Sequence, residues 1–338
     1  MPFRSLAPRR PRQRVRGDGD CDRTDLIANE DTTMTDIAET NLNLAVGLPG
    51  SERLDVAGYL QQLDVWARLV ASSTEGWMPM FHRSATEFDN SLAKFRMMAL
   101  VTVLQRDLGV RYDPACQEGP YCALDPRALF IYGLLDGQGG TCVTMPVLYV
   151  AIGRRLGYPL FLVQAREHFF VRWEEPDGER FSIEATTLGF TPRDDDHFRH
   201  WPKPIRDEDI RQGLFLRNLS PQEERAAFLR ERGQCWLDHL RTEAALEAFV
   251  EAARLYARLP GLQFSWALAT VLHRAVKCWG REILFATSVT EVQLPPMEHS
   301  WEAQVRPLAL EQLRRIVANY RERNLSSVSI DEVVACQA

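Results

Sequence analysis

The sequence lacks three features that would each assign it to a large class of proteins. No segment approaches the ~20 uninterrupted apolar residues that a membrane-spanning helix needs. The seven cysteines are scattered without a CxxC pair, which argues against a paired-cysteine zinc site and favours free thiols in a reducing compartment. No basic stripe dominates, and a net charge of −6 argues against general affinity for nucleic acid. We therefore expect a cytoplasmic protein that binds neither membranes nor nucleic acid.

The 338 residues have an ordinary globular composition, with 45% hydrophobic and 25% charged residues. This length allows two domains, or one domain with a helical extension. The arginine-rich opening, PRRPRQRVR, has no apolar region behind it and is therefore not a secretory signal. Met34 is an alternative start of the natural chain. We expect residues 1–50 to be a disordered tail.

Two amphipathic helices are expected in a helical lead-in over residues 51–125. The first covers 54–70, and a polar stretch from 72 to 88 then predicts an irregular or short helical connection. The second covers 91–108, with Asn90 or Ser91 as its cap and Gly109 at its end. Residues 113–125 contain two prolines and two cysteines, which is typical of a long loop.

The central segment, 126–220, changes from helical to strand-like patterning. Apolar residues after GQGG predict a helix that starts near Met145 and ends at Gly157. LFLVQAREHFFVRWEE is then rich in strand-forming residues, and Pro-Asp-Gly leads into a second strand, ERFSIEATT. This order predicts an α+β domain in which a helix backs an antiparallel sheet.

The C-terminal part is expected to be helical from 221 to about 324, followed by a tail over 326–338. Small and aromatic residues fall at the spacings of one tetratricopeptide unit: Leu229, Gly233, Trp236, Ala245, Phe249 and Ala252. A second match, 34 residues on, is only partial, around Ala267. The pattern therefore predicts a tetratricopeptide-like helical region over 221–325, with a final helix over 301–320.

Cys142 stands where a thiol would be activated. A thiol attacks as its thiolate, and the unpaired N–H groups and dipole at a helix start favour negative charge. Gly139 and Gly140 would let the backbone approach a substrate closely, and Thr141 can cap the helix. Because Pro146 fits poorly just past a first turn, the helix is expected to start a few residues after Cys142.

His168 and Glu184 are the candidate partners of this thiol, on the first and second strands. If Pro-Asp-Gly forms a three-residue loop, Glu175 pairs with Glu179 and Glu184 lies opposite Phe170. Glu184 is then a diagonal neighbour of His168, roughly 7–8 Å away at the Cα level. A two-residue Asp-Gly turn would instead place Glu184 on the opposite face of the sheet.

GQGGTCVTMPVLYVAIGRRLGYPLFLVQAREHFFVRWEE followed by FSIEATT resembles the transglutaminase-like superfamily, and more narrowly the SirB1-type bacterial proteins. The likeness runs from about Leu54 into the helical tail, with the specific motifs at 139–187. It implies a papain-like, transglutaminase-like core without a cofactor. In that core Cys142 is the nucleophile, His168 the base and Glu184 the acidic third member. Many SirB1-like sequences carry Pro-Gly before the His-Phe pair, where this chain has Arg166-Glu167.

For the oxyanion of such a reaction, the backbone N–H of Cys142 is the natural donor, and the Gln138 side chain is the second candidate. Tyr149, Phe169, Phe170 and Trp173 are expected to be core residues.

A metal site is weighed against simpler interpretations at two places. His197 and His200 follow three aspartates, but DDDHFRHWPKP is charged and bounded by proline, which favours a solvated loop that shapes access to the site. Cys116 and Cys122 lack partner histidines. No metal is predicted at either place.

Two functions follow from these patterns. The first is an enzyme that acts on an amide through an acyl-thioester at Cys142, as a peptidase, amidase or acyl transferase. The second is a catalytically silent binding or regulatory protein whose helical tail recruits a peptide or protein partner. A regulator that combines both parts is a third possibility, and the oligomeric state is left open.

Overall fold

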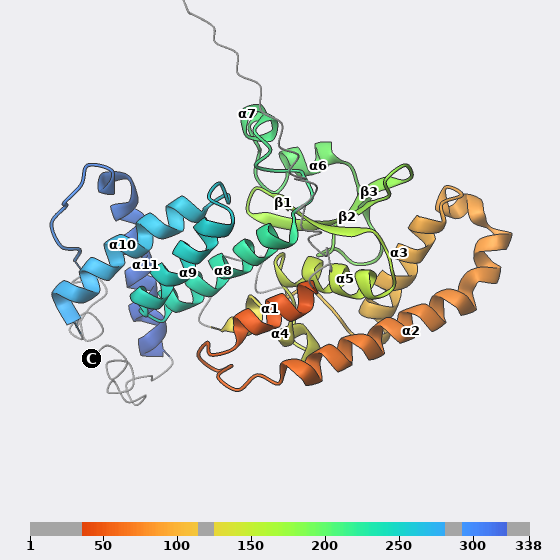
Figure 1. Cartoon of the computed structure of the whole chain (residues 1–338), viewed down its shortest axis with the longest axis horizontal. Helices are drawn as coiled ribbons and strands as arrows, with labels where there is room; N and C mark the ends of the chain where they lie inside the picture. Colours follow the sequence, from red (N-terminus) through yellow and green to blue (C-terminus); the bar gives the residue numbers. More distant parts are fainter. Residues whose placement is uncertain (1–35, 114–124, 281–292, 323–338) are drawn as a thin grey trace, which may run out of the picture. The chain divides into compact units, whose positions relative to one another are not determined.

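The centre of the fold is a four-stranded antiparallel sheet with the strand order β1-β2-β3-β4, of which Figure 1 labels the first three strands. The strands are Leu160–Ala165 (β1), His168–Glu174 (β2), Arg180–Ile183 (β3) and Pro192–Arg193 (β4). The computed structural model describes residues 36–113, 125–280 and 293–322. The arginine-rich opening, Met34, Cys116 and Cys122 therefore lie outside the described residues. The expected α+β class, with helical regions before and after the sheet, is confirmed.

The two faces of the sheet pack on different clusters. One face joins the main core together with the apolar residues of α5 (Thr144–Arg155), through Leu160, Leu162, Phe169, Val171, Trp173 and Ile183. The other face forms a smaller cluster, made of Val163, Ala165, Phe170, Phe198 and Ile205. Because side chains alternate along a strand, His168 and Arg172 share the face of Phe170. Tyr149, Phe169, Phe170 and Trp173 are all buried, as expected.

The expected single strand over LFLVQAREHFFVRWEE is wrong, because this segment is a hairpin. Ala165 pairs with His168, and the turn consists of Arg166 and Glu167 alone. Glu167 has a φ of 63°, in the left-handed region that usually selects glycine or asparagine. Neither residue is a turn signal, so the sequence hid the break. His168 consequently begins the second strand of the sheet and does not lie inside the first.

Of the two registers that the sequence left open across Pro-Asp-Gly, the structure has the one with the three-residue loop. The Glu175 N–H donates to the Glu179 carbonyl at 3.1 Å, which closes a three-residue loop. Val171 pairs with Ile183, so the next position, Glu184, follows opposite Phe170. The odd loop thus brings Glu184 to the face of the sheet that carries His168.

The described residues 36–113 contain three α-helices: α1 (Ile37–Ala45), α2 (Val56–Arg83) and α3 (Leu92–Thr102). The predicted Ser91 cap is confirmed, because its hydroxyl accepts from the Lys94 N–H at 2.9 Å. The polar stretch after 72 is not an irregular connection, since α2 continues to Arg83 and a 3₁₀ turn follows (Ala85–Phe88, η1). After α3 the chain forms a π-helical turn, η2 (Val103–Asp107), and Gly109 ends the segment with a φ of 72°.

The expected disordered tail over 1–50 is wrong from residue 37 onward. α1 buries Ile37 and Leu42 in the main core, and Asp36 caps it by accepting from the Ala38 N–H at 2.9 Å. Polar residues between these apolar positions hid the helix in the sequence. Two short helical segments then lead to the central domain, η4 (Pro126–Ala128) and α4 (Tyr132–Leu135).

The C-terminal region is made of α8 (Pro221–Asp238), α9 (Thr242–Leu255), α10 (Leu262–Trp279) and α11 (Glu302–Glu322). α8 packs closely on α9, and a Cβ added to Gly233 would lie 2.4 Å from the Phe249 ring. The described region is not helical throughout, since residues 293–301 are irregular. The final helix is confirmed, and the tetratricopeptide type stays a prediction. No helix in the described part of the chain is long and apolar enough to span a membrane.

Candidate active site

Cys142 lies in the turn that leads into α5, as the proline argument predicted. α5 begins at Thr144, and the Thr141 hydroxyl accepts from the N–H groups of Val143 and Thr144 at 3.1 and 3.3 Å. The Thr144 hydroxyl accepts in return from the Thr141 N–H at 2.9 Å. Thr141 and Thr144 therefore bind each other reciprocally in the turn before α5, but the N-cap of the helix is Val143, without a side-chain hydrogen bond, and not the predicted Thr141. The turn holds Cys142, which is partly exposed, at the positive end of the helix dipole.

The two glycines before Cys142 serve internal packing. A Cβ on Gly139 would lie 2.7 Å from that of Asp113, and one on Gly140 would lie 2.6 Å from Met145. Gly140 also exchanges backbone hydrogen bonds of 2.8 and 2.9 Å with Arg111 and Asp113. The close approach that the sequence suggested for a substrate is thus made by the protein's own chain, which fixes the loop in front of the thiol.

Cys142 also contacts the hairpin turn that precedes His168. Its Sγ lies 4.0 Å from the Glu167 carbonyl oxygen, at the outer limit of an S–H···O contact. Cys142 is partly exposed to solvent, and Glu167 is exposed. The turn that contacts the thiol therefore lies one residue before His168, the first residue of β2.

His168 and Glu184 form a buried pair. The His168 Nε2 lies 2.8 Å from the Glu184 Oε2, and the two residues are only 5% and 2% exposed. An ionised carboxylate can only accept a hydrogen bond, so the proton between them belongs to Nε2. Nδ1 is then the basic nitrogen of the neutral ring.

The second oxygen of Glu184 is bound by Thr186. Its Oε1 accepts from the Thr186 N–H at 2.8 Å and from the hydroxyl at 2.6 Å. Burial by itself would raise the pKa of Glu184, but the hydrogen bonds from His168 and Thr186 outweigh it and hold the pKa below its usual range. The carboxylate is therefore ionised at neutral pH.

Aromatic rings cover His168 on the face away from α5. Trp201 meets the imidazole edge-on at 4.7 Å between ring centroids, and Phe198 stacks on Phe170 at 3.7 Å. Phe198 belongs to a short helix, α6 (Asp195–His200), and not to the solvated loop that the sequence predicted. Asp194 caps it, accepting from the His197 N–H at 2.8 Å. The three successive aspartates that suggested a loop are a helix start.

An ion pair from a buried arginine links α6 to the sheet. Arg172, 1% exposed, pairs with Asp195 and donates to the Leu216 carbonyl at 3.2 Å. His197 lies 5.4 Å from the Trp201 ring, and burial together with Arg193 lowers the pKa of its imidazole. Within the described ranges, no three or more His, Cys, Asp or Glu side chains are grouped to hold a metal ion.

Gln138, the second oxyanion candidate, is held by Arg127. Only the orientation that turns its amide oxygen toward the guanidinium gives hydrogen bonds, of 3.2 and 2.5 Å. Arg127 is itself paired with Asp125 at 2.7 Å. The carbonyl end of the Gln138 amide is therefore occupied, and its NH₂ group is the donor end.

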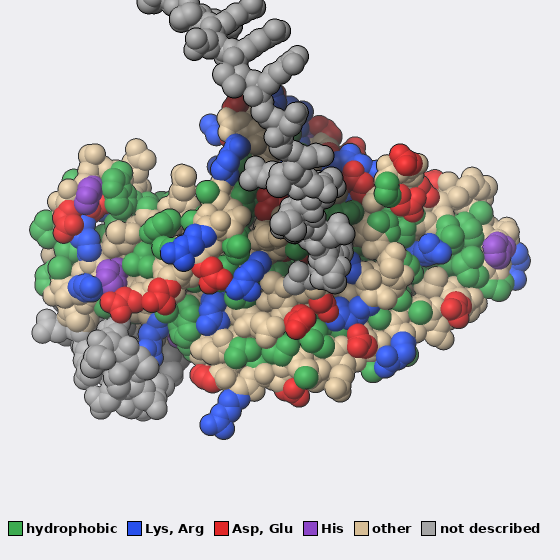
Figure 2. Space-filling model, viewed as in Figure 1, with side chains coloured by type: hydrophobic (Ala, Val, Ile, Leu, Met, Phe, Trp, Pro, Cys, Tyr) green, Lys and Arg blue, Asp and Glu red, His purple; other side chains and the backbone are tan. Residues whose placement is uncertain are grey.

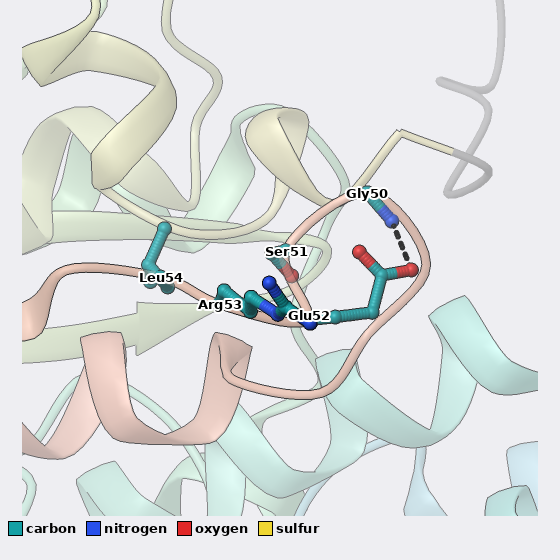
Figure 3. A pocket seen from close by; sticks show the side chains of 5 residues that line it. All are labelled: Gly50, Ser51, Glu52, Arg53 and Leu54. Atoms are coloured by element: carbon teal, nitrogen blue, oxygen red, sulfur yellow. Dashed lines mark hydrogen bonds between the residues drawn. The ribbon is translucent and has the colours of Figure 1, made fainter.

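The pocket in Figure 3 is a separate feature. It is lined by residues of the α1–α2 loop: Gly50, Ser51, Glu52, Arg53 and Leu54. Within it, the Gly50 N–H donates to the Glu52 carboxylate at 3.0 Å. None of these residues belongs to the candidate site. On the face shown in Figure 2, acidic and basic side chains are interspersed.

Sequence analysis missed Thr186, Arg172 and Trp201. The only available signal was the hydroxyl residue two positions after Glu184 in EATT, because Ser and Thr often bind acceptors nearby in the chain.

Comparison with known families supports the fold. Residues 57–220 match the model of the transglutaminase-like superfamily, and we describe this segment as a transglutaminase-like domain. A comparison with curated proteins and one with solved structures each gave no match.

Proposed function

We propose that the transglutaminase-like domain is a thiol enzyme that acts on an amide bond, with Cys142, His168 and Glu184 as its catalytic triad. The observation that carries the proposal is the buried pair of His168 and Glu184, whose side chains lie 2.8 Å apart. His168 directly follows Glu167, the residue whose carbonyl oxygen contacts the Cys142 thiol. In this arrangement Glu184 fixes the ring and its tautomer, and Nδ1 is the base.

The reaction has two stages. The Cys142 proton moves to Nδ1 of His168, and the thiolate attacks the carbonyl carbon of the amide. The backbone N–H of Cys142 and the NH₂ of Gln138 stabilise the oxyanion. The C–N bond then breaks, the amine leaves with the proton from His168, and the acyl group remains on Sγ as a thioester. Water completes a hydrolysis, and a second amine completes an acyl transfer.

The substrate we propose is a peptide or protein segment in the cytoplasm. Within the superfamily we place the chain with the SirB1-type proteins, whose tetratricopeptide-like helices would recruit that segment. The partial exposure of Cys142 and the helical region behind the domain support this assignment.

The test is the rate of iodoacetamide alkylation of each cysteine against pH, read by peptide mass analysis. Cys142 should react well below pH 7 in the wild type, and His168→Ala should move its midpoint toward the ~8.5 of an ordinary thiol. Exposed Cys278 provides the comparison, and buried Cys235 reports unfolding. If Cys142 behaves like Cys278 in both proteins, the triad is not functional.

A second function is favoured by the surface of the tail. Large aromatic side chains there are 37–47% exposed: Phe264, Trp266, Trp279 and Trp301. Exposed aromatic residues are common anchors in protein interfaces. If Cys142 proves unreactive, we expect the chain to be a binding or regulatory protein, and Trp266→Ala should weaken its capture of peptides from a random display library.

A further inference from the structure

Gln105 occupies an unusual position between the helical lead-in and the candidate site. It lies in the π-helical turn η2. This conformation is rare in proteins as a whole, but where it occurs it is often found at functional sites. Its half-buried side chain makes three hydrogen bonds, none of which lies within its own helix. The amide is therefore fully committed to other elements.

Two of these bonds hold the loop that carries Glu184. The Gln105 Nε2 donates to the Thr187 carbonyl at 2.9 Å, and its Oε1 accepts from the Gly189 N–H at 2.7 Å. A side-chain amide that donates to one residue and accepts from the residue two positions on takes the place of a neighbouring strand. The loop is irregular, so this support replaces the sheet pairing it lacks.

The loop in turn fixes Glu184. The Thr187 hydroxyl donates to the Glu184 carbonyl at 3.2 Å, and the Glu184 N–H donates to the Thr191 carbonyl at 3.1 Å. Between them, Thr186 binds the carboxylate directly. A shift of Thr187 would therefore move both the backbone and the carboxylate of Glu184.

The third bond reaches the helix that presents Cys142. The Gln105 Nε2 also donates to the hydroxyl of Tyr149, a fully buried residue of α5, at 2.9 Å. Tyr149 lies near Glu184 as well: burial raises the pKa of its phenol, and the Glu184 charge raises it further. One amide thus joins α5 to the Glu184 loop.

We propose that Gln105 is a positioning residue of the site. It sets the Glu184 loop against α5, and so holds Glu184, the partner of the His168 imidazole, in register with the Cys142 thiol. This inference rests on the proposed function. Gln105 touches neither the thiol nor the imidazole; it acts through Thr187, Gly189 and Tyr149. Because such sites tolerate little displacement, loss of its amide should weaken the activation of Cys142.

The experiment compares Gln105→Met with the wild type in the full chain. Methionine keeps the length of the side chain and removes all three hydrogen bonds. The readout is the ratio of the Cys142 alkylation rate at pH 6 to that at pH 9. We expect about a tenfold fall in this ratio, with the pH 9 rate unchanged, because thiolate forms at pH 9 without an imidazole.

A matched control removes a similar bond elsewhere. Gln234 on α8 donates from its amide to Asp238 at 3.1 Å, outside the transglutaminase-like domain. Gln234→Met should leave the ratio unchanged. Tyr149→Phe removes the hydroxyl and keeps the ring, and it should lower the ratio less than Gln105→Met does. Alkylation of buried Cys235 at pH 9 would reveal unfolding in any variant.

The outcomes separate this inference from the proposed function. If His168→Ala leaves the ratio unchanged, the triad itself fails. If His168→Ala lowers the ratio while folded Gln105→Met and Tyr149→Phe do not, the positioning role is wrong and the triad stands. Should Gln105→Met unfold, Tyr149→Phe decides, and an unchanged ratio in that variant overturns the positioning role.

Discussion

The carboxylate of Glu184 is stable inside the domain because both of its oxygens have hydrogen-bond donors. His168 serves one oxygen and Thr186 serves the other. A buried carboxylate without such donors would take up a proton near neutral pH. At the residue scale, therefore, the candidate site depends on a residue, Thr186, that has no part in the proposed chemistry.

Glu184 should make folding stability sensitive to acid. Its pKa is lower in the folded protein than in the unfolded chain, so its stabilising effect is present above the unfolded value of ~4.3 and is lost as the pH falls through the folded pKa. Glu184→Gln should cost about 1–3 kcal/mol at pH 7. This cost should shrink as the pH falls below ~4.3, as measured by urea unfolding followed by circular dichroism.

Glu247→Gln is the control for this measurement, because Glu247 is exposed on α9. It should change the free energy of unfolding by less than about 0.5 kcal/mol at every pH. A cost of Glu184→Gln that stays constant from pH 7 to pH 3 would contradict the assignment of an ionised, hydrogen-bonded carboxylate.

At the scale of elements, the β1–β2 hairpin places His168 at the start of a strand, one residue after the Glu167 carbonyl that contacts Cys142. The turn accomplishes this with Glu167 in a left-handed conformation, which costs roughly 1–2 kcal/mol for a residue with a Cβ. Glycine at this position would adopt the conformation without strain.

Glu167→Gly should therefore stabilise the protein, by up to about 1 kcal/mol after the greater entropy of glycine in the unfolded chain is subtracted. Thermal unfolding and urea unfolding both measure this. Arg166→Gly is the paired control, because the φ of Arg166 is negative and its guanidinium donates to the Pro204 carbonyl at 3.2 Å. It should destabilise. A loss of stability in Glu167→Gly would show that the turn does not hold the residue in strain.

At the scale of the whole molecule, one hydrophobic cluster joins the described helices of the tail to the transglutaminase-like domain. Leu148 of α5, Phe228 of α8 and Leu272 of α10 all belong to it. α1 contributes to the same cluster. Arg232 of α8 donates hydrogen bonds to the carbonyl of Leu44 in α1 and to that of Val46, just after the helix. We therefore expect the domain and the tail to unfold in one cooperative transition.

Replacing Gly233 of the tail with alanine tests how tightly α8 packs on α9, and the same replacement of Gly76 in the lead-in helix α2 is its comparison. Gly76 in α2 has nothing within 4 Å of an added Cβ, so Gly76→Ala should stabilise by about 1 kcal/mol through helix propensity. Gly233→Ala gains the same propensity but presses on the buried Phe249 ring, and should lose about 1 kcal/mol overall. In each variant, the unfolding transitions followed by circular dichroism and by tryptophan fluorescence should shift together. Equal gains in both variants would mean that the α8–α9 contact is loose.

The sequence by itself determined the α+β class and α5, and it offered the three-residue Pro-Asp-Gly loop that sets Glu184 beside His168 as one of two alternatives. These features depend on neighbours in the chain: caps, breakers, and alternation along strands. Tertiary structure alone decided the Arg166-Glu167 turn, the burial of α1, the helix at 195–200 and the bonds of Gln105. Each of these features is stabilised by contacts with segments distant in the sequence, so a local sequence pattern does not predict it.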